Sequence, residues 1–292
     1  MGARPAALNT VRFSEKILES YGISVETIDL SEIIGNMNRL DNNNPEVQRK
    51  LQEIKDYIDT TGIPEEALIK MAKLYVVLEE WIKATGVSLL SLQCWDSIEE
   101  NYGIMPCTVM SMFSEKLIPA ACEVDLVGGL SMYALQLASQ KPSALVDWNN
   151  NFGEDPDKAI LFHCSNFPKS LLRGAKMGYG DIISSSVSKE KAYGTCYGII
   201  PPGEVTLARL STNDEEGNLI SYIAEGEITS DRVNTFGGVG VAKIEDLQSL
   251  LSYICTNGFE HHVAISLSQS GDILSEAFEN YLGIEAYYHN IY

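Results

Sequence analysis

The order of apolar and polar residues divides the chain into two parts with different periodicities. In the first part, stretches with helical spacing alternate with short β-like runs, and helices that connect strands in this way favour a mostly parallel sheet. The pattern predicts a helix over 12–21, a strand over 23–30, a charged amphipathic segment over 45–60, a long helix over 64–86 and a strand over 87–92. An α/β domain of the doubly wound type is therefore expected.

Beyond about residue 140, short β-like runs dominate and turn sequences separate them. Strands are predicted over 144–148, 159–163, 204–212, 219–226, 262–267 and 284–288, and helices over 245–256 and 271–282. Such a series of strands indicates an antiparallel sheet or a barrel. We place the domain boundary near 137–142, which divides the chain into an α/β domain over 1–138 and a β-rich, barrel-like α+β domain over 139–292.

Charge and composition narrow the functional class. Forty acidic and twenty-one basic residues give a formal net charge of −19, which disfavours binding to nucleic acid or to anionic lipid. The sequence contains neither an apolar run long enough to span a membrane nor a signal peptide at its start, so we expect a cytoplasmic protein. Six scattered cysteines without a C-x-x-C pair predict reduced thiols.

Two acidic residues and three histidines are the candidates for chemistry. Glu123 and Asp147 are embedded in apolar sequence, and acidic residues are seldom buried unless they are paired or bound to a cation. His163 and the pair His261-His262 lie next to predicted strand ends. Carboxylates combined with imidazoles suit Mn²⁺, Fe²⁺, Co²⁺ or Zn²⁺, and oxygen ligands favour manganese or magnesium.

Structural alternatives exist for each of these residues. Glu123 and Asp125 could cap the helix that follows them, where the helix dipole favours negative charge. His163 could be a hydrogen-bonded core residue. Neighbouring residues of a strand point to opposite faces, so only one of His261 and His262 is expected to face a given site.

Two further motifs do not support other enzyme classes. The glycine-rich run over 236–241 lacks a complete G-x-G-x-x-G, and we interpret it as a bulged strand or a tight turn. No G-x-S-x-G sequence occurs, which disfavours a serine hydrolase of the α/β type.

Trp95 and Trp148 are expected to pack in the core or an interface more readily than to form a sugar platform.

Several blocks of the sequence resemble the L-fucose / L-arabinose isomerase family of metal-dependent aldose–ketose isomerases. The first covers 21–33, and the second is Glu123-Val124-Asp125 followed by Gly128-Gly129. Asp147 stands 147 − 123 = 24 positions after Glu123, an interval similar to that between the family's metal-binding glutamate and aspartate. His261-His262-Val263 is similar to the family's C-terminal histidine block.

The resemblance implies a fold and a ligand set. The fold is a Rossmann-like middle domain, here 1–138, followed by a C-terminal domain with a β-barrel core, here 139–292. The implied metal ligands, around Mn²⁺, are Glu123, Asp147, His261 and, as on the arabinose isomerase side, His163. The implied sugar-site residues are Gln93, Trp95 and His262, the last being also the reserve metal ligand.

The same resemblance implies an activity on a small-molecule sugar. Glu123 and Asp147 would act as the acid/base pair that moves a proton between adjacent sugar carbons through a cis-enediol. The family forms homo-oligomers, and its members carry an additional N-terminal α/β domain ahead of the segment that the start of this chain resembles. The alternative expectation is therefore a catalytically incomplete sugar- or metal-binding relative that lacks the first domain.

Overall fold

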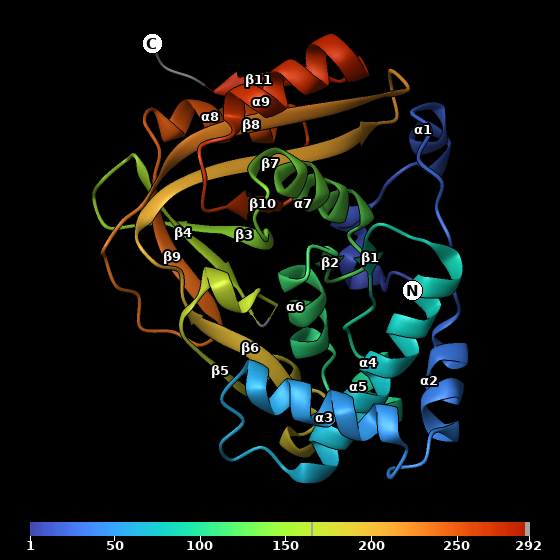
Figure 1. The fold of residues 1–292 in the computed structure, drawn as a ribbon. Coiled ribbons are helices and arrows are strands. Elements are labelled where there is room, and N and C mark those ends of the chain that lie inside the picture. The colour runs from blue at the N-terminus through green and yellow to red at the C-terminus, as the bar shows by residue number, and fades with distance from the viewer. Residues whose placement is uncertain (165, 290–292) are drawn as a thin grey trace.

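Most helices precede residue 140 and most strands follow it, as Figure 1 shows for the computed structural model. The structure describes residues 1–164 and 166–289. The helices are α1 (Glu15–Ser20), α2 (Leu30–Arg39), α3 (Pro45–Tyr57), α4 (Glu65–Thr85), α5 (Ser97–Tyr102), α6 (Cys107–Glu115), α7 (Leu126–Ser139), α8 (Leu247–Thr256) and α9 (Gly271–Glu276). Shorter helical turns are η1 (Ala6–Val11), η2 (Lys169–Leu171), η3 (Ile183–Ser185), η4 (Lys189–Lys191) and the π-type η5 (Ala277–Leu282).

The helices predicted from apolar spacing and end signals are confirmed. In α3, Pro45 occupies the first turn and the side chain of Asn44 accepts a hydrogen bond from the backbone N–H of Glu46. Helix α4 ends at Gly86, whose φ of 71° is the left-handed conformation that glycine adopts without steric cost. No described helix is both long enough and apolar enough to cross a membrane.

The strand predicted over 23–30 is wrong. Residues 23–29 have no regular structure and α2 begins at Leu30, with the Asp29 side chain accepting from the backbone N–H of Ser31. The alternating pattern is present, but the segment is held by isolated backbone bonds, from the N–H of Gly2 to the carbonyl of Ile28 and from the N–H of Ile23 to the carbonyl of Leu18, and it joins no sheet in the described residues. The parallel sheet of this half consists of β1 (Leu90–Ser91) and β2 (Ala120–Ala121) in the described residues, so it does not confirm a Rossmann-like domain.

The second half forms a large sheet that closes on itself. Its strands are β3 (Ala144–Asn151), β4 (Lys158–His163), β5 (Arg173–Tyr179), β6 (Tyr193–Ile199), β7 (Gly203–Asn213), β8 (Asn218–Ile228), β9 (Gly238–Lys243), β10 (His262–Ser266) and β11 (Glu285–His289). The strand order is β11-β8-β7-β10-β3-β4-β9-β6-β5, and a further pairing joins β8 to β9. Strands β8, β7, β10, β3, β4 and β9 thus form a closed antiparallel ring, which agrees with the predicted barrel-like arrangement.

Three strands of this sheet, β5, β6 and β9, were not predicted as regular strands. The run over 236–241, interpreted as a bulged strand or tight turn, leads into β9, which pairs with β4 over its whole length. Glycine is required at 238 because a Cβ there would collide with the ring of Phe167. Close packing against an aromatic ring therefore explains this glycine, and no phosphate loop forms here.

Helix α7 joins the two halves by packing across β7 and β10 (Figure 1). Its inner face buries Val127, Met132 and Leu135 in a cluster with Ala208 of β7 and Ala264 of β10. Asp125 caps the helix by accepting from the N–H of Gly128 at 2.8 Å, as predicted. The first turn of α7 is thereby held against the ring of strands.

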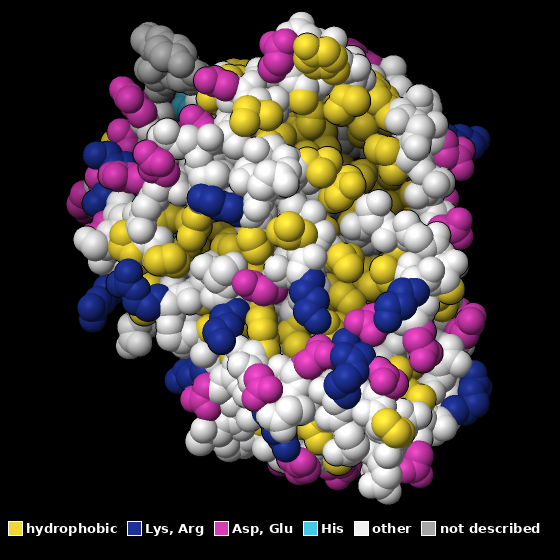
Figure 2. All heavy atoms as spheres, viewed as in Figure 1, with side chains coloured by type: hydrophobic (Ala, Val, Ile, Leu, Met, Phe, Trp, Pro, Cys, Tyr) yellow, Lys and Arg dark blue, Asp and Glu magenta, His cyan; other side chains and the backbone are white. Residues whose placement is uncertain are grey.

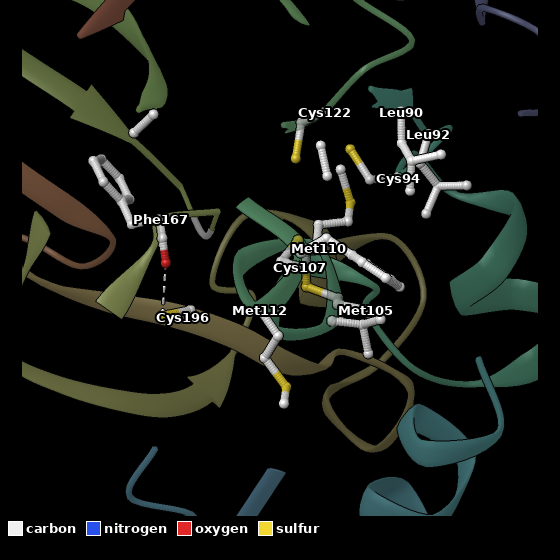
Figure 3. Close-up of a cluster of buried hydrophobic side chains, with 14 of the residues drawn as sticks. Leu90, Leu92, Cys94, Met105, Cys107, Met110, Met112, Cys122, Phe167 and Cys196 are labelled. Carbon is white, nitrogen blue, oxygen red and sulfur yellow. Dashed lines mark hydrogen bonds between the residues drawn. The ribbon is translucent and has the colours of Figure 1, made fainter. Parts of the chain in front are cut away.

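A second, larger core lies around α6 and is rich in sulfur. Figure 3 shows Cys94, Cys107 and Cys122 in this cluster together with Met105 and Met110. All are buried, and none of the six cysteines, which all lie in the described residues, forms a disulfide. Because Cys122 directly precedes Glu123, this packed core supports the segment that carries a candidate site residue.

A groove of about 1080 Å³ lies between α7, the segment over 20–27 and the end of η5. Figure 2 shows hydrophobic side chains gathered on the same face of the molecule. The groove is lined by Val124 and Leu126 but by none of the candidate acidic or histidine residues. It is therefore distinct from the predicted site.

Candidate functional site

Glu123 is placed by a sharp turn between β2 and α7. Glu123 and Val124 have φ angles of 63° and 58°, a left-handed conformation that non-glycine residues rarely adopt. Two such residues in succession cost about 1–3 kcal/mol each and persist only where the surrounding packing imposes them. The turn aims a carboxylate into the protein, where its side chain is only 11 % exposed.

Asp147 and His262 come together through strand pairing. Antiparallel strands β3 and β10 place Asp147 directly opposite His262. His262 is fully buried, and its Nε2 lies 3.5 Å from Asp147 Oδ1 and 3.7 Å from Glu123 Oε2. The two predicted acidic residues thus meet at one imidazole nitrogen.

His261 also reaches this cluster, contrary to the expectation that only one histidine of the pair would face the site. Its Nε2 lies 3.5 Å from Asp147 Oδ1 and 3.9 Å from Glu123 Oε2. The physical reason is that β10 begins at His262, so His261 lies in the preceding loop and is not bound by strand alternation. The two imidazole centroids are 4.0 Å apart.

His163, at the end of β4, completes the cluster. It is buried, and its ring centroid lies 5.9 Å from that of His262. In the described part of the chain, two groups of ligand atoms are close enough to hold one metal ion each: Glu123, His163 and His262, or Asp147, His261 and His262. His262 belongs to both groups, whereas the resemblance gave His261 the stronger claim as ligand.

The carboxylates of the cluster are electrostatically perturbed. Burial raises the pKa of Glu123 to about 7, against the opposing influence of His262. Burial also raises the pKa of Asp147, and His262 again opposes the shift. A positive charge near these two carboxylates would therefore stabilise their ionised forms, which burial disfavours.

The pKa values of the three imidazoles shift in opposite directions. Burial lowers the pKa of His163 to about 3 and of His261 to about 4, and the neighbouring His262 adds to both shifts. Burial alone would lower the pKa of His262 too, but its hydrogen bond to Asp125 and the nearby carboxylates raise it overall. His163 and His261 are accordingly neutral near pH 7, the state in which a histidine can be a metal ligand.

Sequence reasoning missed a buried ionic network behind His262. Asp125 Oδ2 lies 2.9 Å from His262 Nδ1 and accepts from Arg209 Nη1 at 2.6 Å, while Arg209 Nε donates to Glu260 Oε2 at 3.0 Å. The capping role predicted for Asp125 accounts for only part of its contacts. Arg209 is a single charged residue in an otherwise apolar strand pattern, and this is the signal that could have indicated the network, because arginine is rarely buried without a partner.

Gln93 and Trp95, two of the three predicted sugar-site residues, belong to the segment that follows β1. The N–H of Glu123 donates to Cys94 Sγ at 3.4 Å, so the segment that carries Gln93 and Trp95 runs next to the turn at Glu123. The Gln93 amide is engaged within the protein: its Oε1 accepts from the N–H of Ala3, and its Nε2 donates to the carbonyl of Trp95. Gln93 therefore connects its own segment to the first residues of the chain.

The residues fit a divalent cation. Glu123 Oε2 and His262 Nε2 are buried polar atoms without a hydrogen-bond partner in the described part of the chain. Buried polar atoms are normally satisfied, so a pair of unsatisfied atoms that face each other calls for a bound group. Carboxylate oxygens combined with neutral imidazole nitrogens are the donor set of Mn²⁺, Fe²⁺, Co²⁺ and Zn²⁺.

The sequence is similar to those of known sugar isomerases. Residues 161–289 match the family model of the L-fucose isomerase C-terminal domain. The sulfoquinovose isomerase of Clostridium sp. (strain MSTE9) is 26% identical over 167 residues, which cover 56% of this chain and 37% of that protein. The sulfoquinovose isomerase of Alkalicoccus urumqiensis is 24% identical over 251 residues, 84% of this chain and 54% of that protein. The sulfoquinovose isomerase of Priestia aryabhattai is 22% identical over 268 residues, which cover 91% of this chain and 57% of that protein.

The chain spans about half the length of these last two relatives. The region that matches the family model begins within β4 and ends with β11. It therefore contains His163, His261 and His262. The resemblance predicted from the sequence blocks is confirmed: residues 161–289 match the C-terminal domain of the L-fucose isomerases, and the similar proteins are sugar isomerases.

Proposed function

We propose that this chain holds the metal-dependent centre of an aldose–ketose isomerase. The observation that carries the proposal is the convergence of Glu123, Asp147 and His262: Glu123 Oε2 and His262 Nε2 lie 3.7 Å apart, and neither has a hydrogen-bond partner among the described residues. The match to the L-fucose isomerase C-terminal domain and the sulfoquinovose isomerase relatives support the same reaction class. The chain's partial coverage of those relatives leaves the activity itself to be measured.

Glu123, Asp147 and one or both of His262 and His261 would hold the cation, with His163 as a further ligand on the Glu123 side. Mn²⁺ is the proposed ion because the set combines hard carboxylate oxygens with nitrogen ligands. When bound, the cation supplies positive charge that stabilises the negative charge developing on the sugar O1 and O2 and keeps both carboxylates ionised.

The chain's own carboxylates would move the proton. One of Glu123 and Asp147 takes the proton from C2 of the open-chain aldose and leaves a cis-enediol. The same carboxyl group returns that proton to C1, while the proton of the O2 hydroxyl passes to O1. The atoms of the sugar are conserved, and the product is the ketose. The Glu123 side chain is the more buried of the two, 11 % exposed against 27 % for Asp147, and burial favours this transfer.

The proposed substrate is a small aldose. The relatives' names make sulfoquinovose a candidate, and the family resemblance adds L-fucose, D-arabinose and L-arabinose. We also propose that the chain works as a homo-oligomer, as the resemblance implies.

The test is ketose formation from this panel of sugars. Protein stripped with a chelator is assayed before and after addition of Mn²⁺, alongside Glu123→Gln and the exposed control Glu154→Gln. We expect turnover that requires Mn²⁺, is lost in Glu123→Gln and persists in Glu154→Gln.

Two other outcomes would change the conclusion. Turnover that is indifferent to chelator and Mn²⁺ would contradict a metal-dependent centre. Tight Mn²⁺ binding without turnover on any sugar would favour the alternative function, a sugar- or metal-binding relative that is catalytically incomplete.

A further inference from the structure

Arg209 lies at the centre of the buried network behind the site. It is fully buried on β7, and its guanidinium donates from Nη1 and Nη2 to the two oxygens of Asp125 at 2.6 and 3.1 Å. Its Nε donates to Glu260 Oε2 at 3.0 Å. Asp125 follows Glu123 by two positions, and Glu260 directly precedes His261. One rigid guanidinium therefore ties together the two segments that carry site residues.

The bonds to Asp125 determine which nitrogen of His262 faces the site. Oδ1 of Asp125 accepts from Arg209 Nη2 and from the N–H of Gly128, and Oδ2 accepts from Arg209 Nη1. An ionised carboxylate can only accept, so His262 Nδ1, 2.9 Å from Oδ2, must carry the hydrogen. In the neutral ring the other nitrogen, Nε2, then has a free lone pair. That atom is the one directed at Glu123 and Asp147.

We propose that Arg209 is a positioning residue: by holding both oxygens of Asp125, it keeps His262 in the tautomer whose Nε2 lone pair points into the site. Arg209 touches neither Glu123 nor Asp147 in any bond or ion pair of the described residues, and it acts through Asp125. The role of the lone pair as a metal ligand rests on the proposed function, whereas the tautomer itself does not.

The backbone supplies independent support for this arrangement. A Cβ at position 128 would lie 2.6 Å from Arg209 Nη1 and would also collide with the carboxylate of Asp125. Glycine at 128 is thus what allows the guanidinium and the carboxylate to meet above the first turn of α7. At Gly129 a Cβ would meet the flexible end of Leu89 at 3.2 Å, Ala121 Cβ at 3.4 Å and the carbonyl oxygen of Leu90 at 3.6 Å, none of which belongs to the buried network.

Asp125→Asn tests the proposal with nearly unchanged volume. If the NH₂ of the new asparagine took the place of Oδ1, it would face two donors, the N–H of Gly128 and Arg209 Nη2. If it took the place of Oδ2, it would face one donor, Arg209 Nη1, and could itself donate to His262 Nδ1. The second placement has fewer clashes, so we expect the hydrogen of His262 to move to Nε2. Without the free lone pair, affinity for Mn²⁺ should fall about 10–100-fold, as for other residues that orient a metal-binding histidine.

Two measurements on the full chain report this change. The first is ¹⁵N–¹H NMR of the histidine rings in metal-free protein, at a pH high enough to leave the rings neutral. The second is calorimetric titration with Mn²⁺ alone. We expect wild type to carry the His262 hydrogen on Nδ1 and Asp125→Asn to carry it on Nε2, with the weaker Mn²⁺ affinity.

Gly128→Ala and Gly129→Ala form a matched pair that removes no polar group, and only the first adds a Cβ against Arg209 and Asp125. We expect Gly128→Ala to weaken Mn²⁺ binding by a factor similar to that of Asp125→Asn and Gly129→Ala to bind within about threefold of wild type. This pair decides the question if Asp125→Asn fails to fold, because alanine has a higher helix propensity than glycine in both variants.

A His262 hydrogen on Nε2 in wild type, or an unchanged tautomer and Mn²⁺ affinity in folded Asp125→Asn, would overturn the proposal. Equal effects of the two alanine variants would overturn it as well. If wild type bound no Mn²⁺ but showed the expected tautomers, the proposed function would fail while the positioning role of Arg209 would stand.

Discussion

Asp147 of β3 and His262 of β10 are paired directly across two antiparallel strands, with Asp147 Oδ1 and His262 Nε2 3.5 Å apart. Paired residues project from the same face of a sheet, so this register alone brings an acid and an imidazole from distant parts of the sequence into one site. The turn at Glu123 then adds a second carboxylate from the opposite half of the chain.

This convergence predicts that Mn²⁺ stabilises the folded protein. A cation that binds only the folded state adds about 2.7 kcal/mol at a concentration 100 times its Kd, so thermal unfolding should shift upward on titration with MnCl₂. Asp147→Ala should abolish most of the shift, and the exposed variant Asp181→Ala should retain it. Equal shifts in both variants would exclude Asp147 from the binding site.

His262 should contribute more than His261 to metal affinity. His262 is fully buried, is oriented by Asp125 and belongs to both possible ligand groups, whereas the side chain of His261 is 38 % exposed and belongs to one. Calorimetric titration of Mn²⁺ should therefore show a loss of affinity at least about tenfold larger for His262→Gln than for His261→Gln, given the importance of oriented ligands. The reverse order would support the ligand assignment that the sequence resemblance implies.

Glu99, in α5, makes stability depend on pH. Burial raises its pKa from 4.5 to about 9, so between these values the carboxyl group is protonated in the folded protein and ionised in the unfolded chain. The folded state then binds more protons, and the free energy of unfolding falls as pH rises, by up to about 1.4 kcal/mol per pH unit.

Glu99→Gln removes this titration and should leave a flatter pH profile. In urea unfolding, the stabilising effect of the substitution should be near zero at about pH 5 and grow toward about pH 8. Only the wild-type carboxyl group must take up a proton on folding, and that uptake costs more free energy as pH rises. The adjacent variant Glu100→Gln, whose side chain is 49 % exposed in the wild type, should follow the wild-type profile. A constant difference between Glu99→Gln and wild type across this pH range would contradict the shifted pKa.

Arg209→Met should be strongly destabilising. It leaves the buried carboxylates of Asp125 and Glu260 without their cation, and breaking one side of a buried ion pair costs about 3–5 kcal/mol. Arg49→Met is the matched control, because the half-exposed Arg49 pairs with Glu46, Glu53 and Glu79 at the surface and such pairs contribute about 0–1 kcal/mol. Urea unfolding of both variants measures the difference, and similar losses would show that the buried network is not a major source of stability.

The sequence predicted those elements whose signals are local. Helix α4 was readable from Pro64 and Gly86 at its ends, and α7 from the Asp125 cap. Strands β7 and β8 were readable from alternation on either side of a polar turn. The segment over 23–30 failed because alternation predicts an extended conformation but not a partner strand, and the partner is decided by packing.

For the site, the sequence by itself identified the residue types: acids in apolar surroundings and histidines near strand ends, which already indicated a cation. Only the tertiary structure decided how they combine. Strand register placed Asp147 against His262, the start of β10 freed His261 from alternation, and burial brought Arg209 to Asp125. The physical reason is that these contacts join residues far apart in the chain, so they depend on pairing and close packing that no local pattern encodes.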